Sequence, residues 1–444
     1  MKRTRIVGIL AGVALVAACA PKPLILKGPR FDPRTPLDQV MAKDAVPPGP
    51  DLGKARPIRL SAPVVNADWA QRNGGPQHHM TQPALGATLT EVWEASIGKP
   101  DDQRHAISTT PVVAAGRVYT LDSRATVVAT STSGATLWSR DLTPPGDSPD
   151  TVSGGGIAYG AGKLFVTSDF GELVALDPAT GAVIWRQRFK APVTGTPTVE
   201  GNVVYVVARD SSGWAIDAAT GKIRWQLDGV QSPNGMTGGA GPAISGGFVL
   251  LPFPSGQLVG ALQPGGTQVW ASSVVGDRLG QGYGLMADIT GDPVVVGSRI
   301  YVGNATGRVM ALTSSTGEQI WSADYGVVSP VWPEGDSIFL VSDQAQLVRL
   351  DAATGAEVWK TPMPLYVPVK KEKRRRDIYA YYGPIMAGNR LIVTSSDGQI
   401  RSFDPVSGKL ISTVPMGAGA ASAAVVAGRT LYVVGEDGKL RAFR

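Results

Sequence analysis

Short runs of apolar and β-branched residues alternate with turn residues along most of the chain. Residues 203–207 (VVYVV) and 391–394 (LIVT) are two such runs, and Gly, Asn and Asp stand beside them. Runs of this length between turn residues are typical of β-strands, and the units that contain them lack the 3.6-residue apolar period of an amphipathic helix. The pattern therefore predicts an all-β protein.

One segment of about ten residues recurs through the chain. The clearest copies are LDPATGAVIW at 176–185, IDAATGKIRW at 216–225 and LDAATGAEVW at 350–359, and looser copies lie at 129–138, 262–270, 312–321 and 403–412. An Asp that leaves a strand can accept hydrogen bonds from N–H groups two or three residues on, and Gly takes the positive φ that returns the chain as a bulged hairpin. Each copy therefore predicts a hairpin with a Trp on its returning strand.

The spacing of these tryptophans indicates the architecture. They recur every 38 to 51 residues, at Trp93, Trp138, Trp185, Trp225, Trp270, Trp321 and Trp359. This is the length of one four-stranded propeller blade, and one large side chain per hairpin can fill the gap between neighbouring sheets. Helical repeats share some of these periods, but the strand-like content of the units excludes them.

The two ends of the repeat region complete each other. Residues 89–93 form a Trp-bearing strand with no strands before it, while residues 423–426, 431–434 and 438–443 form three strands without a fourth. Pairing them closes the ring and leaves no exposed sheet edge there. With seven complete units between them, the chain is predicted to be an eight-bladed β-propeller of four-stranded blades.

Most units open with a proline after a longer segment at the hub. These prolines are Pro111, Pro197, Pro242, Pro293, Pro330 and Pro384. We expect them to precede the outer strands of each blade. The hub segments vary most, and variable loops on a rigid scaffold usually carry the binding surface.

The first 62 residues differ from the rest. Lys2, Arg3 and Arg5 precede an apolar run at 6–16, so residues 1–18 are typical of an export signal rather than of a buried N-terminal helix. The run is too short to span a membrane. Residues 19–62 are rich in Pro and predict a tether, with the propeller at 63–444, and about forty such residues reach roughly 35 Å as a flexible coil.

The motifs resemble those of a known family. The repeat Asp-x-x-Thr-Gly-x-x-x-Trp resembles the PQQ-type propeller repeat, and residues 16–19 (VAAC) resemble the lipobox of bacterial lipoproteins. Together they resemble the BamB family, lipoprotein subunits of the outer-membrane β-barrel assembly machinery. The resemblance implies that Cys19, the only cysteine, carries a lipid, and Ala20 after it implies passage to the outer membrane, facing the periplasm.

The same resemblance implies a function and partners. It implies a non-catalytic scaffold that docks BamA, the central barrel protein, and works with other assembly lipoproteins and unfolded outer-membrane proteins. An exported protein is not expected to bind nucleic acid. In the family the BamA-binding surface lies on two loops of adjacent blades, which here correspond to residues 232–238 and 278–290.

The match in these loops is partial. The resemblance assigns partner binding to Met236, Thr237, Leu279, Asp288 and Thr290. Asp288 matches the family's first acidic residue, but Thr290 stands in place of the second and Thr237 in place of an Arg. The alternative for Asp288 is that it caps a turn at the hub.

The rival function in this repeat class is a PQQ-dependent dehydrogenase-like quinoprotein. Such enzymes commonly carry a pair of adjacent cysteines and a Ca²⁺ site, whereas this chain has only Cys19 and uses most of its Asp residues in turns. We therefore expect no cofactor and no enzymatic activity. His78, His79 and His105 are the only histidines, and we interpret them as surface or capping residues rather than metal ligands.

The net charge is +6, and part of it lies in one run, KKEKRRR at 370–376, near Tyr366 and Tyr379. Such a run can bind nucleic acid, anionic lipid head groups or an acidic protein, or can be a solvated loop without a function. The export signal argues against nucleic acid, and the other three interpretations stay open.

Overall fold

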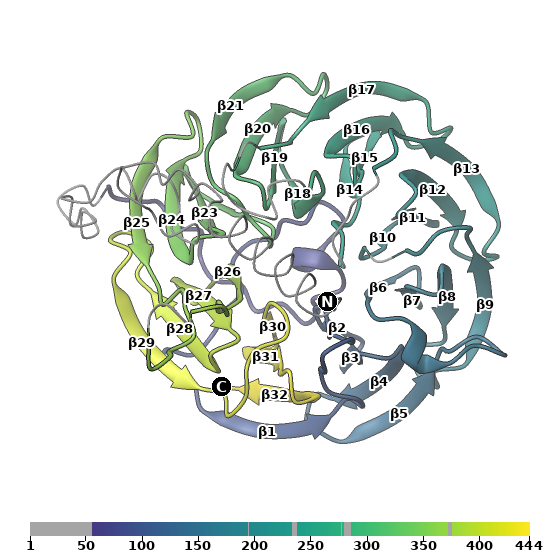
Figure 1. Cartoon of the computed structure of the whole chain (residues 1–444), viewed down its shortest axis with the longest axis horizontal. Coiled ribbons are helices and arrows are strands. Elements are labelled where there is room, and N and C mark those ends of the chain that lie inside the picture. The colour runs from purple at the N-terminus through teal and green to yellow at the C-terminus, as the bar shows by residue number, and fades with distance from the viewer. Residues whose placement is uncertain (1–55, 194, 233–237, 277, 279–285, 372–374) are drawn as a thin grey trace, which may run out of the picture. The chain divides into compact units, whose positions relative to one another are not determined.

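The computed structural model describes residues 56–193, 195–232, 238–276, 278, 286–371 and 375–444. The predicted export signal, Cys19, Met236, Thr237 and Leu279 lie outside these residues. Within them the chain forms eight four-stranded antiparallel sheets arranged around a central axis (Figure 1). The predicted eight-bladed β-propeller is thus confirmed. None of the helices in the described ranges is both long enough and apolar enough to span a membrane.

Each blade runs from an innermost strand at the hub to an outermost strand at the rim. The first four are β2(Val112–Ala114) to β5(Thr136–Asp141) with β3(Arg117–Leu121) and β4(Thr126–Ser131); β6(Gly155–Gly160) to β9(Val183–Arg188) with β7(Lys163–Ser168) and β8(Glu172–Leu176); β10(Thr198–Glu200) to β13(Ile223–Asp228) with β11(Val203–Val207) and β12(Ser212–Asp217); and β14(Ala243–Ser245) to β17(Gln268–Ser273) with β15(Phe248–Pro252) and β16(Gln257–Leu262).

The remaining blades continue around the ring. They are β18(Ile289–Val296) to β21(Gln319–Ala323) with β19(Arg299–Asn304) and β20(Arg308–Thr313); β22(Trp332–Glu334) to β25(Glu357–Pro362) with β23(Ser337–Val341) and β24(Gln346–Asp351); β26(Tyr381–Ala387) to β29(Leu410–Pro415) with β27(Arg390–Ser395) and β28(Gln399–Phe403); and the closing blade of β30(Val425–Ala427), β31(Thr430–Val434), β32(Lys439–Phe443) and β1(Glu91–Ser96). Two short 3₁₀ helices, η2(Arg72–Gly74) and η3(Pro149–Thr151), lie in connecting segments.

The prolines that open the units belong to the innermost strands, not the outer ones as expected. Pro111 and Pro197 directly precede β2 and β10, and Pro293 and Pro384 lie within β18 and β26. An innermost strand pairs with its sheet on one side only, so a residue without an N–H group is tolerated on the other side.

The repeated hairpin forms as predicted. The carboxylate of Asp177 accepts hydrogen bonds from the N–H groups of Ala179 (3.0 Å) and Thr180 (2.8 Å), and Gly181 has φ +69°. The pairing of β8 with β9 shifts register at Ala175 and Leu176, which marks the bulge. Hairpins at Asp217 and Asp351 repeat these bonds.

Each Trp of an outermost strand contacts the hairpin of the next blade. Nε1 of Trp138 donates to the carbonyl oxygen of Pro178 (3.1 Å), and its ring lies 5.9 Å from the ring of Tyr119 in its own blade. The Trp138 ring also lies against Gly181 of that hairpin. The other outermost Trp residues contact the corresponding glycine of the next blade, in the pairs Trp93–Gly134, Trp185–Gly221, Trp225–Gly266, Trp270–Gly317, Trp321–Gly355 and Trp359–Gly408.

The ring closes as the sequence predicts. β1 pairs with β32, in a register that places Trp93 opposite Ala442. Trp93 is half-buried between the closing blade and the first complete blade, where its Nε1 donates to the carbonyl oxygen of Thr132 (3.2 Å). No hairpin joins β32 to β1, because these strands come from opposite ends of the repeat region. The outermost strand of the preceding blade, β29, has Ser412 at the position where the other blades have Trp.

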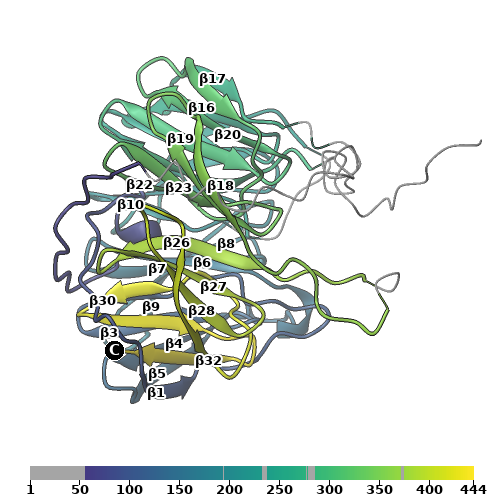
Figure 2. The ribbon, with the colours of Figure 1, turned by 90° about the vertical axis from the view of Figure 1, so that its left-hand side faces the viewer.

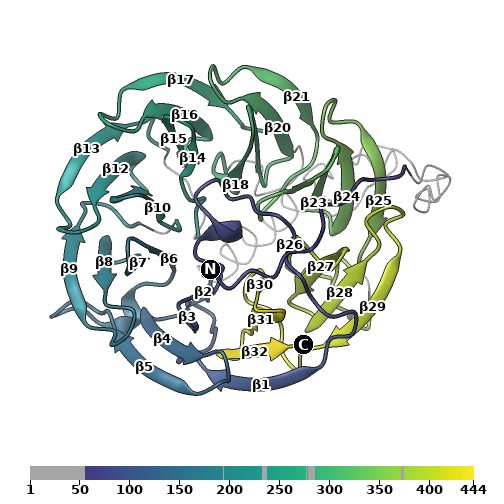
Figure 3. The same cartoon turned by 180° about the vertical axis from the view of Figure 1, so that it is seen from behind.

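Residues 56–90 cross one face of the ring as an irregular segment, which we call the cross-segment (Figure 3). Trp69 is the one Trp, Tyr or Phe residue of the cross-segment; it is 1% exposed, and its ring lies 6.3 Å from that of Trp332. The cross-segment hydrogen-bonds to the innermost strand, or to the turn after it, in all eight blades, through the pairs Ser61–Glu334, Asn66–Val426, Trp69–Val113, Ala70–Tyr159, Gln71–Val199, Pro76–Ile244, Gln77–Val295 and Pro83–Gly388.

The contacts of the cross-segment begin before the predicted domain boundary at 62/63. Arg56 forms ion pairs with Asp336 (2.8 Å) and Asp351, and its carbonyl oxygen accepts a bond from Arg349 (2.6 Å). Residues 56–62 therefore lie on blade β22–β25 rather than in a tether.

Candidate partner-binding surface

The ring presents two different faces. The cross-segment covers one face, and the other carries the segments that link each outermost strand to the innermost strand of the next blade. Figure 2 shows the cross-segment on one side and residues 363–371 and 375–380 projecting from the opposite side. We call this second face the loop face. The loops assigned to partner binding, 232–238 and 278–290, were predicted within or beside two of these linking segments, 229–242 between β13 and β14 and 274–288 between β17 and β18.

Asp292 ties the roots of these two segments together. Its side chain is 2% exposed, and Oδ1 accepts a hydrogen bond from the N–H group of Gly241 at the end of the first segment (2.7 Å). Oδ2 accepts one from Nε of Arg72 in the cross-segment (3.0 Å). One buried carboxylate therefore joins two adjacent blades to the cross-segment that seals the other face.

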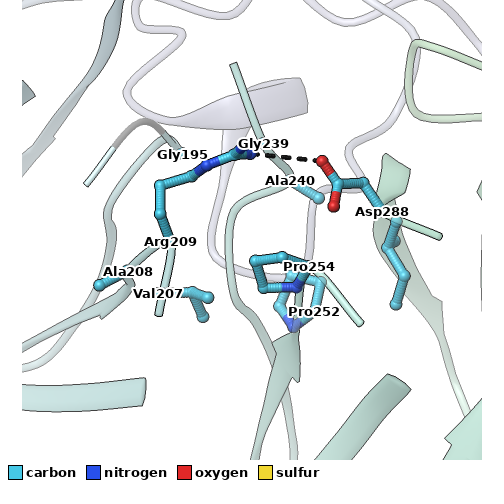
Figure 4. A pocket seen from close by; sticks show the side chains of 10 residues that line it. Gly195, Val207, Ala208, Arg209, Gly239, Ala240, Pro252, Pro254 and Asp288 are labelled. Carbon is cyan, nitrogen blue, oxygen red and sulfur yellow. Dashed lines mark hydrogen bonds and ion pairs between the residues drawn. The ribbon is translucent and has the colours of Figure 1, made fainter. Parts of the chain in front are cut away.

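Asp288 also lies beneath the loop face. It is 3% exposed, and Oδ2 lies 3.3 Å from Nη1 of Arg209, which comes from the turn between β11 and β12 in another blade (Figure 4). The pair borders a small cleft lined also by Val207, Pro252 and Pro254. The carboxylate is thus placed to hold the segment in position from below.

Thr290 is buried as well, and its hydroxyl group donates to the carbonyl oxygen of Val327. The structure brings Asp288 and Thr290 together at the root of the second segment. Their role in partner binding stays a prediction, as does that of Met236, Thr237 and Leu279, which lie outside the described residues.

A second ion pair holds the start of the 274–288 segment. Nη2 of Arg278 lies 2.9 Å from Oδ1 of Asp343, and the N–H group of Arg278 donates to the carbonyl oxygen of Thr306 (3.0 Å). The anchoring residues Arg72, Arg209, Arg278 and Asp292 were not identified as functional from the sequence. In the sequence, only the position of Asp292 directly before the repeated proline could have indicated its role. The arginines pair with residues of distant blades, and such pairs are not visible in a short stretch of sequence.

Beside these segments the loop face has an open polar cavity of about 570 Å³. Its walls include Arg104, His105, Asp169 and Arg209. Burial raises the pKa of the Asp169 carboxyl to about 6. The His105 ring is held by Asp102, with Nδ1 2.9 Å from Oδ1.

Two of the three histidines, His78 and His105, are buried rather than at the surface, and His79 is partly buried. His78 is fully buried, its Nδ1 lies 2.9 Å from the carbonyl oxygen of Pro293, and burial lowers its pKa. His105 is 6% exposed and belongs to the cavity wall. In the part of the chain that the structure describes, no three His, Cys, Asp or Glu side chains are grouped to hold a metal ion.

Comparison with known proteins identifies the family of the chain. A family model described as outer membrane protein assembly factor BamB matches residues 123–361, more than half of the 444 residues. The chain belongs to the BamB family. BamB of Shewanella oneidensis is 26% identical over 358 residues, 78% of this chain and 87% of that protein, and BamB of Yersinia pestis is 23% identical over 80% and 88%.

Solved structures agree on the fold. The crystal structure of BamB from Moraxella catarrhalis superposes with a TM-score of 0.66 at 20% identity and covers 80% of this chain and all of that one. The quinohemoprotein alcohol dehydrogenase of Comamonas testosteroni has a TM-score of 0.63 at 15% identity, over 93% and 82% of the two chains. At these identities the likeness to solved structures concerns the propeller fold alone, and the family membership rests on the family model.

Proposed function

We propose that this BamB-family chain is a non-catalytic periplasmic scaffold of outer-membrane protein assembly. A lipid on Cys19 anchors it to the outer membrane, and the ring docks BamA and assists the insertion of β-barrel proteins together with other assembly lipoproteins. The family membership and the lipobox-like residues 16–19 support this proposal.

The docking surface is the part of the loop face formed by the segments 229–242 and 274–288. The observation that carries this assignment is the shared anchor at Asp292, which holds the roots of two segments from adjacent blades. Met236, Thr237 and Leu279 contact the partner, and Asp288 and Thr290 act from beneath. Rigid roots lower the entropy that two loops lose on binding.

Unfolded outer-membrane proteins contact the rim. The outermost strands end their sheets, so one edge of each is not bonded within its sheet. These strands also expose aliphatic side chains, among them Val92, Leu137, Ile184, Val269 and Ile411. An extended chain with alternating apolar residues can add to such an edge by β-augmentation.

Co-purification from detergent-solubilised envelopes tests the docking surface. The double variant Met236→Ala with Leu279→Ala should lose the barrel protein, since truncation of an anchor residue typically weakens binding by about 2 kcal/mol or more. Its urea midpoint should stay that of the wild type.

The matched control is Leu137→Ala with Ile184→Ala, which removes two aliphatic side chains from the rim. The control should retain the barrel protein. A loop variant that keeps the barrel protein, or a rim variant that loses it, would place docking elsewhere on the ring.

A further inference from the structure

Residues 363–371 and 375–380, between β25 and β26, form the two arms of a hairpin that projects from the loop face (Figure 2). The N–H group of Val367 donates to the carbonyl oxygen of Asp377 (3.0 Å), and that of Tyr379 donates to Leu365 (2.9 Å). At the root, the hydroxyl group of Tyr381 donates to the carbonyl oxygen of Pro364 (2.6 Å). The hairpin is therefore a built stalk rather than a loose connection.

The far end of this hairpin is strongly cationic. Residues 363–380 contain six Lys or Arg residues and two acidic residues, Glu372 and Asp377. Lys370, Lys371 and Arg376 are exposed, whereas Arg375 lies against the Tyr366 ring, 5.2 Å from its centroid. The three exposed cations thus stand on a stalk that an aromatic contact stiffens.

Exposed aliphatic side chains accompany these cations. Val369, 41% exposed, directly precedes Lys370, and Ile378, 54% exposed, lies on the returning arm of the hairpin, where it pairs with Tyr366. Cations suit the phosphates of lipid head groups, and adjacent aliphatic groups suit the boundary between head groups and acyl chains. An acidic protein surface would account for the cations alone.

The blade that bears the hairpin also receives the chain from the predicted anchor. Arg56 is ion-paired with Asp336 and Asp351 of blade β22–β25, and β25 leads directly into the hairpin. If Cys19 is lipidated as proposed above, the chain that reaches this blade at Arg56 is the one that carries the membrane anchor.

We propose that the hairpin binds the surface of an anionic phospholipid membrane, as a second contact beside the lipid anchor. Lys370, Lys371 and Arg376 contact lipid phosphates, and Val369 and Ile378 enter the interface. Two contacts of one blade with the same surface restrict the rotation of the ring, which fixes the direction in which the loop face points.

Vesicle sedimentation tests the proposal. All forms are full chains with Cys19→Ser, and they are mixed with vesicles of phosphatidylcholine alone or with an equal part of phosphatidylglycerol. Each cation near an anionic membrane contributes about fivefold to binding, so Lys370→Glu with Lys371→Glu and Arg376→Glu should lower binding to the anionic vesicles by at least about a hundredfold. Ile378→Ser should lower it by about tenfold, because an aliphatic side chain leaves the interface.

The control reverses three exposed cations of other blades, Lys190, Lys222 and Arg429, each to Glu, so its net charge matches. It should retain most of the binding. Raising the salt from about 0.1 M to about 1 M should release the wild type, because the Debye length falls from about 10 Å to about 3 Å.

Equal losses in the two charge-reversal variants, or equal binding to both kinds of vesicle, would overturn the proposal. So would a hairpin variant that keeps vesicle binding but loses the barrel protein in co-purification, since the hairpin would then contact a protein. The docking proposal is judged separately by the loop variants, so failure of one does not decide the other.

Discussion

The indole ring of Trp138 lies so close to Gly181 of the next blade that a Cβ atom on this glycine would stand 2.5 Å from the ring. Gly181 also has φ +69°, where L side chains are strained. The repeated glycine therefore meets two demands, the turn within its own hairpin and the space for the Trp of the preceding blade.

Two alanine substitutions separate these demands. Gly162 has φ +70°, but nothing lies within 4 Å of where its Cβ would stand. Gly162→Ala should therefore cost only the backbone term, about 1–2 kcal/mol. Gly181→Ala should cost about 1–3 kcal/mol more, because the ring of Trp138 must move. Urea unfolding measures both, and equal losses would show that the ring contact is unimportant.

Local physics explains what the sequence could predict. The Asp, the Gly and the Trp of each hairpin lie within ten residues, so the turn, the bulge and the strand after it are visible in one segment. The exception is also explained. Ser412 stands in place of Trp on β29 because the next blade has no hairpin between β32 and β1, and so offers no turn glycine to contact.

Contacts between distant segments were not predictable in this way. The burial of His78 depends on the carbonyl oxygen of Pro293, and the burial of Asp288 depends on Arg209 from another blade. Each pair is separated by many residues and forms only when the ring closes. Trp69 gave a weak signal, since it stands outside the regular spacing that begins at Trp93.

The cross-segment should contribute strongly to stability. Trp69 is 1% exposed and stacks with Trp332, so Trp69→Ala should lower the free energy of unfolding by about 3–5 kcal/mol. Trp69→Phe should cost less, because it keeps an aromatic ring and Nε1 of Trp69 has no hydrogen-bond partner among the described residues. Deletion of residues 20–55 should leave the urea midpoint unchanged. If the deletion lowers the urea midpoint as much as Trp69→Ala does, the residues before Arg56 stabilise the ring as well.

Loss of the Asp292 carboxylate should loosen the end of the segment 229–242 in addition to lowering the stability of the fold. Asp292→Ala leaves the N–H group of Gly241 and the guanidinium of Arg72 without this acceptor, at a cost of about 3 kcal/mol. Asp292→Asn keeps an acceptor for Gly241 and should cost less. Hydrogen exchange of the peptide containing Gly241 should accelerate far more in the Ala variant than in the Asn variant. Uniform acceleration around the whole ring would instead indicate general destabilisation.

The stability that Asp101 contributes beside the closing blade should be lost as the pH rises through 6. The backbone N–H group of Asp101 donates to the backbone carbonyl oxygen of Glu436 (2.8 Å). Burial raises the pKa of the Asp101 carboxyl to about 6. Between the ordinary pKa of 3.8 and this value the folded protein holds a proton that the unfolded chain has released. The contribution of Asp101 to stability is therefore greatest below about pH 4 and is lost as the pH rises to about 6. Burial and Asp101 raise the pKa of Glu436 in the same sense.

Asp101→Asn should remove part of this slope, since the amide cannot ionise and its oxygen can still accept the bond from Ile107 (2.7 Å). The variant should therefore melt above the wild type at pH 7.5 and close to it at pH 4. Asp102→Asn is the control of opposite sign, because hydrogen bonds from Arg104 and His105 lower the pKa of the Asp102 carboxyl. It should melt below the wild type at pH 7.5, and the difference should shrink as the pH falls below about 4. Melting temperatures of the three proteins across this range decide the matter, and parallel curves for Asp101→Asn and the wild type would contradict a raised pKa at Asp101.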